Sequence, residues 1–519
     1  MTEKTLELTG KRIRGSFCIE EIPGPAGVII YGASGDLTSR KLVPSLYALF
    51  QKNLLPTRFF ILGCARSSFT DRSFRAHLEQ ALQEQGYVVD ADRMQRFLDR
   101  CFYVSGDYAS MRFYERISGR LQELERSLGE EHCRIHYLAT PPGVNQAIVE
   151  RLGQAGLTRI PGMRGELVRV VVEKPFGRDL ESAMDLDRSL RSVLSENQIY
   201  RIDHYLGKET VQNILLFRFA NSIFEPIWNR RYVDHIQITV AESIGVEHRA
   251  GYFEQAGLLR DMFQNHMLQM LSLATMEPPI SFDGDRVRDE KVKLLRSIRP
   301  FRFEDPDTRV IRGQYTGGEV DGSRVPGYRG EEGVSPDSIV ETFVAAKVCL
   351  DNWRWQGVPI YLRAGKRMAK KASRISVQFK SVPHSMFKPL EPDDLSPNVL
   401  MFNVQPEEGI LLGIQAKRPG PKLCMDTLHM HFHYKDVITG PLPDAYERLL
   451  LDCMLGDQTL FIRHDDMEVS WSLITPLLRE WEKPDSVKSH PLHRYQAGSW
   501  GPQASSELLQ QGGRSWINS

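Results

Sequence analysis

The stretch that decides the fold is AGVIIYGASGDLTSRKL, residues 26–42. It opens with an apolar run of strand length, and Gly32 and Gly35 follow at once. Leucines then recur at helical spacing, which predicts a helix that begins near Asp36. The spacing of the glycines alone is a weak signal. A strand, a glycine turn and a helix in this order, however, place free backbone amides where they favour a phosphate anion.

The rest of the first two hundred residues repeats this alternation of strand and helix. Apolar runs of strand length occur at 58–64, 101–106, 134–140, 167–175 and 198–203, and polar periodic segments of helix length separate them. Strands alternating with helices predict a parallel sheet covered on both faces. We therefore expect an α/β Rossmann-type doubly wound domain over residues 26–204, with ligands at the carboxyl ends of its strands.

The pattern changes after residue 205. A strand-like segment at 234–243 comes before a long helix candidate at 252–276. Strand-like segments joined by short turns follow at 361–365, 374–380, 400–405, 410–417 and 428–436. This predicts an α+β domain over 205–485 with a large, mainly antiparallel sheet. Residues 311–337, rich in glycine and charge, are expected to form a long irregular connection. A flexible N-terminal extension (1–25) and a polar, poorly held C-terminal tail (486–519) complete the chain.

Composition excludes several classes of protein. Lys plus Arg and Asp plus Glu both number 66, so the formal net charge is zero, which argues against a nucleic-acid binder or an anionic-membrane binder. No run approaches the ~20 apolar residues of a membrane span, and the N-terminus lacks a signal-like apolar stretch. The seven cysteines are scattered with no CxxC pair. They favour a reducing compartment, and we expect a cytoplasmic protein.

Charged residues follow two of the predicted strands. Arg66, with serines after it, ends the strand at 58–64. An arginine there suits the 2′-phosphate of NADP, whereas a surface arginine in a loop is the alternative. Lys174, in the segment VVVEKPFGRD, ends the strand at 167–175 and is expected to face the crevice of the sheet. The alternative is a solvated lysine at a strand end.

The segment RIDHYLGKE, residues 201–209, combines several ionisable side chains at a strand-to-helix junction. His204, Tyr205 and Lys208 supply two neutral donors and an ammonium group beside free backbone amides. That is the outline of a phosphate site, and a plain polar loop is the alternative.

His266 lies in the long helix candidate, five residues after Asp261. A five-residue step turns an α-helix by roughly 140°, so the two side chains are not expected to share a face. His266 instead shares an apolar stripe with Met262 and Met270. From the pattern alone, a buried core histidine is the favoured interpretation.

Two further polar segments belong to the second half of the chain. Residues 363–374 hold six Lys and Arg residues between two strands, either as a solvated hairpin or as an anion grip over the cleft. His429, His431 and His433 alternate along a strand. They would suit zinc or a subunit contact, and the absence of a neighbouring acidic or cysteine cluster favours the subunit contact.

Together, these segments resemble the glucose-6-phosphate dehydrogenase family. The resemblance runs from residue 26 to about 483 and rests on GASGDLTSRKL, EKPFG, RIDHYLGKETVQNILLFRFAN, GYFEQAGLLRDMFQNHMLQ, RAGKRM and PDAYERLLLD, in the order of the family. It implies oxidation of D-glucose 6-phosphate to 6-phosphoglucono-1,5-lactone, with hydride transfer to NADP and with NAD as a weaker alternative. It also implies that no metal is needed, and that the C-terminal sheet forms a homodimer or homotetramer.

The resemblance also implies roles for individual residues. His266 would be the general base, and Asp203 would orient it. Substrate-binding residues would be Lys174, His204, Tyr205, Lys208, Glu242, Asp261, Lys366 and Lys371. Coenzyme-binding residues would be Gly32, Ala33, Ser34, Gly35, Asp36, Leu37, Arg66 and Lys174. The chain departs from the family at Asn145, where some members place a tyrosine. It also departs at Asn403, where an arginine would serve a second, structural NADP.

Two other functions fit part of this pattern. One is a related sugar oxidoreductase that acts on an unphosphorylated sugar, and the phosphate cluster at 204–208 argues against it. The other is a non-catalytic sensor of NADP or a sugar phosphate. The presence of both Asp203 and His266 argues against a sensor.

Overall fold

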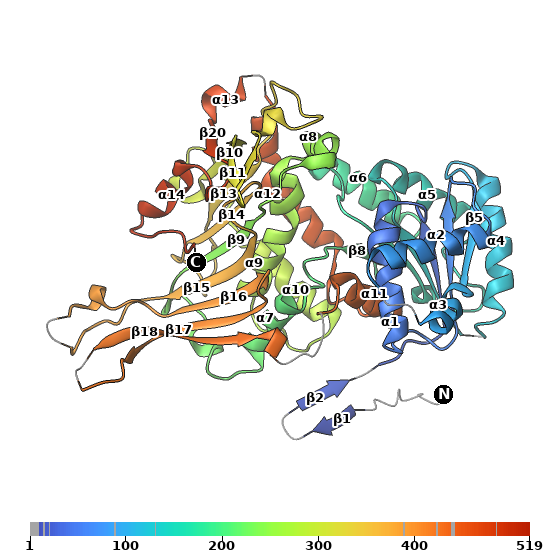
Figure 1. Cartoon of the computed structure of the whole chain (residues 1–519), viewed down its shortest axis with the longest axis horizontal. Coiled ribbons are helices and arrows are strands. Elements are labelled where there is room, and N and C mark those ends of the chain that lie inside the picture. Colours follow the sequence, from blue (N-terminus) through green and yellow to red (C-terminus); the bar gives the residue numbers. More distant parts are fainter. Residues whose placement is uncertain are drawn as a thin grey trace.

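The computed structural model describes residues 10–13, 16–19, 21–87, 90–129, 131–387, 390–421, 424–436, 442–483 and 485–518. Two sheets organise the described chain, one of seven strands and one of nine. In Figure 1 the seven-stranded sheet and its helices lie on the right, and the long strands of the larger sheet extend to the left. Among the described residues, no helix has the length and apolarity that crossing a membrane requires.

The seven-stranded sheet confirms the predicted doubly wound domain. Its order is β19-β8-β7-β6-β3-β4-β5, and the six strands from β3 to β8 are parallel. The order steps outward from β3 in both directions, which is the dinucleotide-binding arrangement with its switch point between β3 and β6. The six strands are β3 (Ala26–Tyr31), β4 (Phe59–Ala65), β5 (Cys101–Ser105), β6 (Cys133–Leu138), β7 (Val168–Val172) and β8 (Ile199–Ile202).

Helices cover both faces of this sheet (Figure 1). They are α1 (Val43–Gln51), α2 (Asp71–Glu84), α3 (Ala91–Leu98), α4 (Met111–Glu125), α5 (Pro142–Gln154) and α6 (Leu180–Arg191). Because both faces are covered, every residue of β3 and β4 is buried, which explains the unbroken apolar runs in the sequence. A seventh strand, β19 (Phe461–Ile462), pairs antiparallel with β8 and comes from far along the chain.

The glycine turn after β3 requires its first glycine. Gly32 has φ 87°, and a Cβ atom there would lie 2.3 Å from the carbonyl oxygen of Ala139. Only glycine fits that position without strain. The chain then turns into a helix at Asp36, which continues through the π-helical segment η1 (Thr38–Leu42) into α1. The predicted strand, turn and helix are all present.

The nine-stranded sheet confirms the predicted second domain. Its order is β18-β17-β16-β15-β9-β14-β13-β10-β20, and only the β9–β14 and β10–β20 pairs are parallel. The strands are β9 (Val233–Ala241), β10 (Val310–Thr316), β13 (Phe343–Val348), β14 (Ile360–Gly365), β15 (Ala372–Phe379), β16 (Val399–Gln405), β17 (Gly409–Lys417), β18 (Met425–His433) and β20 (Leu492–Gln496).

Helices fill the space between the large sheet and the dinucleotide-binding domain (Figure 1). They are α7 (Glu209–Phe219), α8 (Ala250–Leu258), η6 (Leu259–Met267), α9 (Leu268–Thr275), α10 (Gly284–Leu295), α11 (Ala445–Leu455) and α12 (His464–Trp481). The long helix predicted at 252–276 is therefore three segments. Gly257 breaks it with φ 63° and ψ 175°, and η6 is a π-helix.

The irregular connection predicted at 311–337 is wrong over part of its length. Strand β10 begins at Val310, and β11 (Gly318–Val320) pairs with β12 (Ser323–Val325). The hydrophobic pattern of the sequence did not indicate β10, because two of its buried side chains are polar. The Arg312 guanidinium donates to the carbonyl of His490, and Gln314 donates to the carbonyl of Ser338. Such satisfied polar groups are stable inside a protein, but they break the apolar pattern of a strand.

The poorly held tail predicted at 486–519 is also wrong. Strand β20 pairs with β10 inside the large sheet, and α14 (Gln503–Gln510) follows it. Trp516 is buried, and the Arg363 guanidinium lies 4.2 Å from the centre of its ring. The sequence concealed this because the tail docks through a few tryptophans and cation–π contacts rather than a regular apolar face. In the N-terminal extension, β1 (Gly10–Ile13) pairs with β2 (Ser16–Ile19), and residues 1–9 lie outside the described ranges.

We expect the Trp516→Ala variant to be destabilised by about 3–5 kcal/mol, because a buried tryptophan and its contact with Arg363 are lost. Trp353→Ala is the matched control, since Trp353 is 97% exposed and its loss should change stability by less than ~0.5 kcal/mol. Thermal unfolding of both variants measures the difference. Equal melting temperatures for the two variants would contradict the docking of the tail.

Candidate active site

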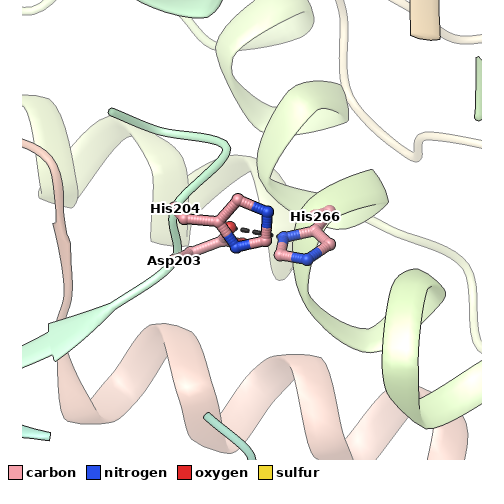
Figure 2. Close-up of side chains that lie close together, drawn as sticks. All are labelled: Asp203, His204 and His266. Atoms are coloured by element: carbon pink, nitrogen blue, oxygen red, sulfur yellow. Dashed lines mark hydrogen bonds and ion pairs between the residues drawn. The ribbon is translucent and has the colours of Figure 1, made fainter. Parts of the chain in front are cut away.

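The end of β8 and the π-helix η6 bring together Asp203 and His266. The Nδ1–H group of His266 donates to Oδ1 of Asp203, and both side chains are 1% exposed. The backbone N–H of Tyr205 also donates to Asp203 Oδ1, at 2.9 Å. Figure 2 shows the two rings of His204 and His266 side by side, with the Asp203 carboxylate bonded to the second. The histidine that the pattern alone placed in the core is therefore held by a buried carboxylate.

Lys174, just after β7, completes this arrangement. Its Nζ lies 2.7 Å from Nε2 of His266 and 2.9 Å from the backbone oxygen of Asp261. An ammonium group can only donate, so Nε2 of His266 is the acceptor and Nδ1 carries the proton. The imidazole is consequently in the tautomer whose free lone pair, on Nε2, points away from Asp203 and can take up a proton.

The π-helix overturns the expectation that Asp261 and His266 lie on different faces. That expectation assumed an α-helix, but residues 259–267 have the i→i+5 bonding of a π-helix. A five-residue step then returns to nearly the same face. Lys174 touches both residues, with 3.5 Å between its Nζ and Oδ1 of Asp261. π-Helical segments are rare and occur often at functional sites.

Burial and neighbouring charges set the protonation states of this cluster. Burial lowers the pKa of His266, the charge of Asp203 opposes this, and the charge of Lys174 lowers the pKa further. The net shift is downward, so the imidazole is neutral at neutral pH. Burial acts to raise the pKa of Asp203, but the hydrogen bond from His266 and the positive charge of Lys174 outweigh it and lower that pKa. A neutral imidazole held by a carboxylate is the form that a general base needs.

The other members of the RIDHYLGKE segment surround His266. The ring of Tyr205 stacks on the ring of His266 with 4.3 Å between centroids, and the ring of His204 meets it edge-on at 4.6 Å. Lys208 Nζ lies 4.4 Å from the centre of the Tyr205 ring and donates to Oε1 of Gln405 at 2.7 Å. Burial lowers the pKa of Lys208 to about 8.

The lysines of the second domain approach the same cluster. Lys366 Nζ donates to Oε2 of Glu242 at 2.6 Å. Burial acts to raise the pKa of Asp261, and the charges of Lys174 and Lys366 lower it to about 2. Lys371 is exposed, and its charge helps to lower the pKa of Lys208.

Sequence reasoning missed three polar residues in this region. The Tyr252 hydroxyl donates to Oδ1 of Asp261 at 3.2 Å. Gln405, at the end of β16, donates from Nε2 to the hydroxyl oxygen of Ser373 at 2.9 Å. Tyr252 stands inside the GYFEQ motif and was within reach of pattern analysis. Gln405 carried no such signal, because it meets Lys208 only through the fold.

The glycine turn lies at the carboxyl end of β3 and has the features that a dinucleotide needs. The Ser67 hydroxyl, after β4, donates to the hydroxyl oxygen of Ser34 in the turn at 2.9 Å, and Arg66 beside it is exposed. Asn145 is buried and accepts from the hydroxyl of Thr140, while its Nδ2 has no protein partner. An unpaired buried amide beside the turn fits a bound coenzyme.

The other predicted coenzyme residues occupy the same turn. Ala33 is buried, Gly35 and Leu37 are half-buried, and the exposed Asp36 carboxylate lies 3.5 Å from the Arg40 guanidinium. The Asp36 carboxylate pairs with Arg40. Its relevance to a phosphate is therefore its position at the N-terminus of the helix, which favours anions.

Metal-ligand geometry does not occur at the predicted histidine strand. On β18 the rings of His429 and His431 are 6.0 Å apart, and those of His431 and His433 are 5.6 Å apart. Across the described ranges, the one group close enough to share an ion is Asp203, His204 and His266. The Lys174 ammonium lies against this group and would repel a cation, so we interpret the group as an acid–base cluster.

A dinucleotide-binding domain beside a buried, carboxylate-bonded histidine and a set of lysines is typical of nicotinamide-dependent dehydrogenases. Comparison with known proteins agrees. The family model "Glucose-6-phosphate dehydrogenase, NAD binding domain" matches residues 29–213, and the model of the C-terminal domain of the same family matches residues 215–517. The chain belongs to the glucose-6-phosphate dehydrogenase family.

Individual relatives cover nearly the whole chain. Glucose-6-phosphate 1-dehydrogenase of Chlamydia pneumoniae is 44% identical over 501 residues, which are 95% of this chain and 96% of the relative. The Bacillus subtilis enzyme is 40% identical over 494 residues, 95% of this chain and 98% of the relative. A solved structure of glucose-6-phosphate dehydrogenase in complex with its substrate glucose 6-phosphate has a TM-score of 0.87 and 37% identity, and the match covers 96% of this chain and 99% of that chain.

The lowered pKa of Lys208 generates a pH prediction. Lys208 is cationic below pH 8 and loses its charge as the pH rises through about 8. We therefore expect the affinity for inorganic phosphate to fall roughly tenfold between pH 7.5 and pH 9. Calorimetric titration measures it.

A Lys208→Arg variant keeps its charge over this range, so its phosphate affinity should stay nearly constant. Lys52→Arg is the matched control, because Lys52 pairs with Glu447 and with no residue of the predicted phosphate site, so the variant should leave the fall unchanged. A wild-type affinity that does not change up to pH 9 would contradict the role of Lys208 in phosphate binding.

Proposed function

We propose that this chain oxidises D-glucose 6-phosphate to 6-phosphoglucono-1,5-lactone with hydride transfer from C1 to NADP, as the first step of the oxidative pentose phosphate pathway. The observation that carries the proposal is the neutral His266, bonded through Nδ1 to Asp203 and presenting Nε2 to Lys174. Membership of the family, and a relative solved with glucose 6-phosphate, support the choice of substrate.

In this mechanism His266 is the general base. Its Nε2 takes the proton of the C1 hydroxyl, and the Asp203 carboxylate stabilises the imidazolium that forms. The Lys174 ammonium lies against Nε2 of His266, where the C1 hydroxyl would bind. With substrate bound, Lys174 would instead donate to sugar oxygen atoms, and Asp261 would keep it in position.

The coenzyme supplies the acceptor for the hydride of C1. Residues of this chain that would hold it are Gly32 to Leu37 at the turn, with Lys174 at the nicotinamide end. Arg66 is exposed at the end of β4, and no acidic residue replaces it there, so it suits a 2′-phosphate. We therefore propose NADP as the preferred coenzyme, with NAD as the weaker alternative.

The phosphate of the substrate would bind at the β8–α7 junction. The His204 ring and the Lys208 ammonium both lie against the Tyr205 ring there, and the charge of Lys371 acts on Lys208. Glu242 and Lys366, which pair with each other, would separate to bind sugar hydroxyls together with Asp261. A phosphate dianion would neutralise the positive charges of Lys208 and Lys371, whereas an unphosphorylated sugar would not.

The two alternative functions are weaker for physical reasons. An unphosphorylated sugar would leave the partly buried ammonium of Lys208 uncompensated. A non-catalytic sensor has no need for a histidine whose tautomer and pKa both suit a base. Neither alternative explains the whole cluster.

We also propose a homodimer or homotetramer formed through the large sheet, and a cytoplasmic location. Strand β18 is an edge strand with exposed Leu428, Met430 and Phe432. Exposed apolar side chains on an edge strand favour a protein contact. The location rests on the cysteines: the six whose side chains the structure describes are all unpaired, which suits a reducing compartment.

The test is an absorbance assay of coenzyme reduction with glucose 6-phosphate. We expect turnover with NADP that exceeds turnover with NAD, and loss of most activity on unphosphorylated glucose. His266→Asn should lower kcat by about 10²–10⁴-fold with little change in KM, because only proton removal is lost.

His384→Asn is the control, since His384 is exposed and outside the cluster. Equal kcat/KM for glucose and glucose 6-phosphate would overturn the substrate assignment. A wild-type kcat in the His266→Asn variant would overturn the assignment of the base.

A further inference from the structure

The helix segment that carries the base starts at an unusual point. Helix α8 breaks at Gly257, and η6 begins two residues later at Leu259. The first N–H groups of a helix have no partner inside it, so they need acceptors from elsewhere. Asp261 and His266 both lie on η6, and therefore the start of this segment sets where both side chains point.

One residue 82 positions further along the chain than Leu259 supplies acceptors for two of these groups. Glu341 accepts the N–H of Leu258 with its backbone oxygen at 3.1 Å, and the N–H of Leu259 with Oε1 at 2.9 Å. Its side chain is buried, with 7% exposure. A Cβ atom on Gly257 would lie 2.4 Å from Oε1 of Glu341, so the carboxylate fills the space that only a glycine leaves open.

Thr342, the residue after Glu341, connects the start of η6 to Lys366 in the second domain. The backbone oxygen of Thr342 accepts the N–H of Lys366 at 2.9 Å. The hydroxyl of Tyr495, on β20, contacts both the backbone oxygen of Thr342 and that of Lys366, at 3.1 and 2.7 Å. Two consecutive residues thus fix the start of η6 and the lysine that pairs with Glu242.

We propose that Glu341 is a positioning residue for the reaction: its carboxylate fixes the start of η6 and thereby holds His266 against Asp203 and Lys174. The inference rests on the proposed function, because it concerns the same base. Glu341 touches none of the reacting groups itself. It acts through the π-helix, whose i→i+5 register brings Asp261 and His266 to one face. Without this anchor, the segment is expected to relax toward the ordinary α-helix, in which the two residues diverge.

The test compares three variants by kcat, KM and melting temperature. Glu341→Ala removes the acceptor, and we expect kcat to fall at least tenfold. KM for glucose 6-phosphate should rise by a smaller factor than kcat falls, because Asp261 lies on η6 but Tyr205 and Lys208 do not. Glu341→Gln keeps an oxygen at the same place and should restore kcat to within threefold of wild type. Glu341→Asp keeps the charge but is one methylene shorter, so it should resemble Glu341→Ala.

Asp90→Ala is the matched control. Asp90 caps α3 in the dinucleotide-binding domain by accepting two backbone N–H groups, far from η6 in the sequence. Its loss should lower the melting temperature and leave kcat unchanged.

A wild-type kcat in Glu341→Ala, measured well below its melting temperature, would overturn the proposal. So would a Gln variant as impaired as the Ala variant. If Glu341→Ala does not fold, a wild-type kcat in the Glu341→Asp variant would overturn the proposal. An inactive wild-type protein would refute the proposed function rather than the role of Glu341.

Discussion

The hydrogen bond between His266 and Asp203 is the interaction on which the site depends. It joins the end of a strand in the dinucleotide-binding sheet to a helix that packs in the second domain. One bond thus locks the imidazole in a single tautomer and ties the two halves of the site together. Because both groups are buried, water does not compete for the bond, and the bond keeps the carboxylate charged and the imidazole ready to take up a proton.

Two groups of residues with different roles surround the bond between His266 and Asp203. On one side, Lys174 faces the lone pair of His266, and Asp261 lies against Lys174. On the other, His204, Tyr205 and Lys208 form a cationic and aromatic wall suited to a phosphate. The crowded segment RIDHYLGKE therefore contributes to two tasks, since its aspartate orients the base and its later residues face the anion. A single strand end can do both because its side chains diverge there.

Much of the fold was predictable because buried strands are rich in apolar residues, which the sequence shows directly. The six parallel strands are largely buried, so most of their residues are apolar, and Gly32 marks the glycine turn. Strand β10 and the C-terminal tail were missed because they are not held by a regular apolar pattern. Strand β10 contains Arg312 and Gln314, which are buried but satisfied, and the tail docks through Trp516. Neither feature has a periodic signal.

The site was predictable to a similar extent, and for a similar reason. The expectation that Lys174 faces the crevice follows from the rule that ligands bind at carboxyl ends, and His204, Tyr205 and Lys208 were predicted from their strand-to-helix junction. Pairing His266 with Asp203 did not follow from periodicity, because the α-helical period places His266 in an apolar stripe. Only the resemblance to a family pointed to it, and the π-helix supplies the physical explanation. Gln405 and Glu341 left no signal, since each acts through a contact more than 80 residues away.

The central claim is that Asp203 and His266 act as one unit. A double-mutant cycle tests this most directly, with kcat measured at saturating glucose 6-phosphate and NADP for Asp203→Asn, His266→Asn and the double variant. If Asp203 acts only through His266, the double variant should be no slower than His266→Asn alone, within about threefold. Losses in kcat that multiply in the double variant would show that the two residues act independently, and would contradict the account.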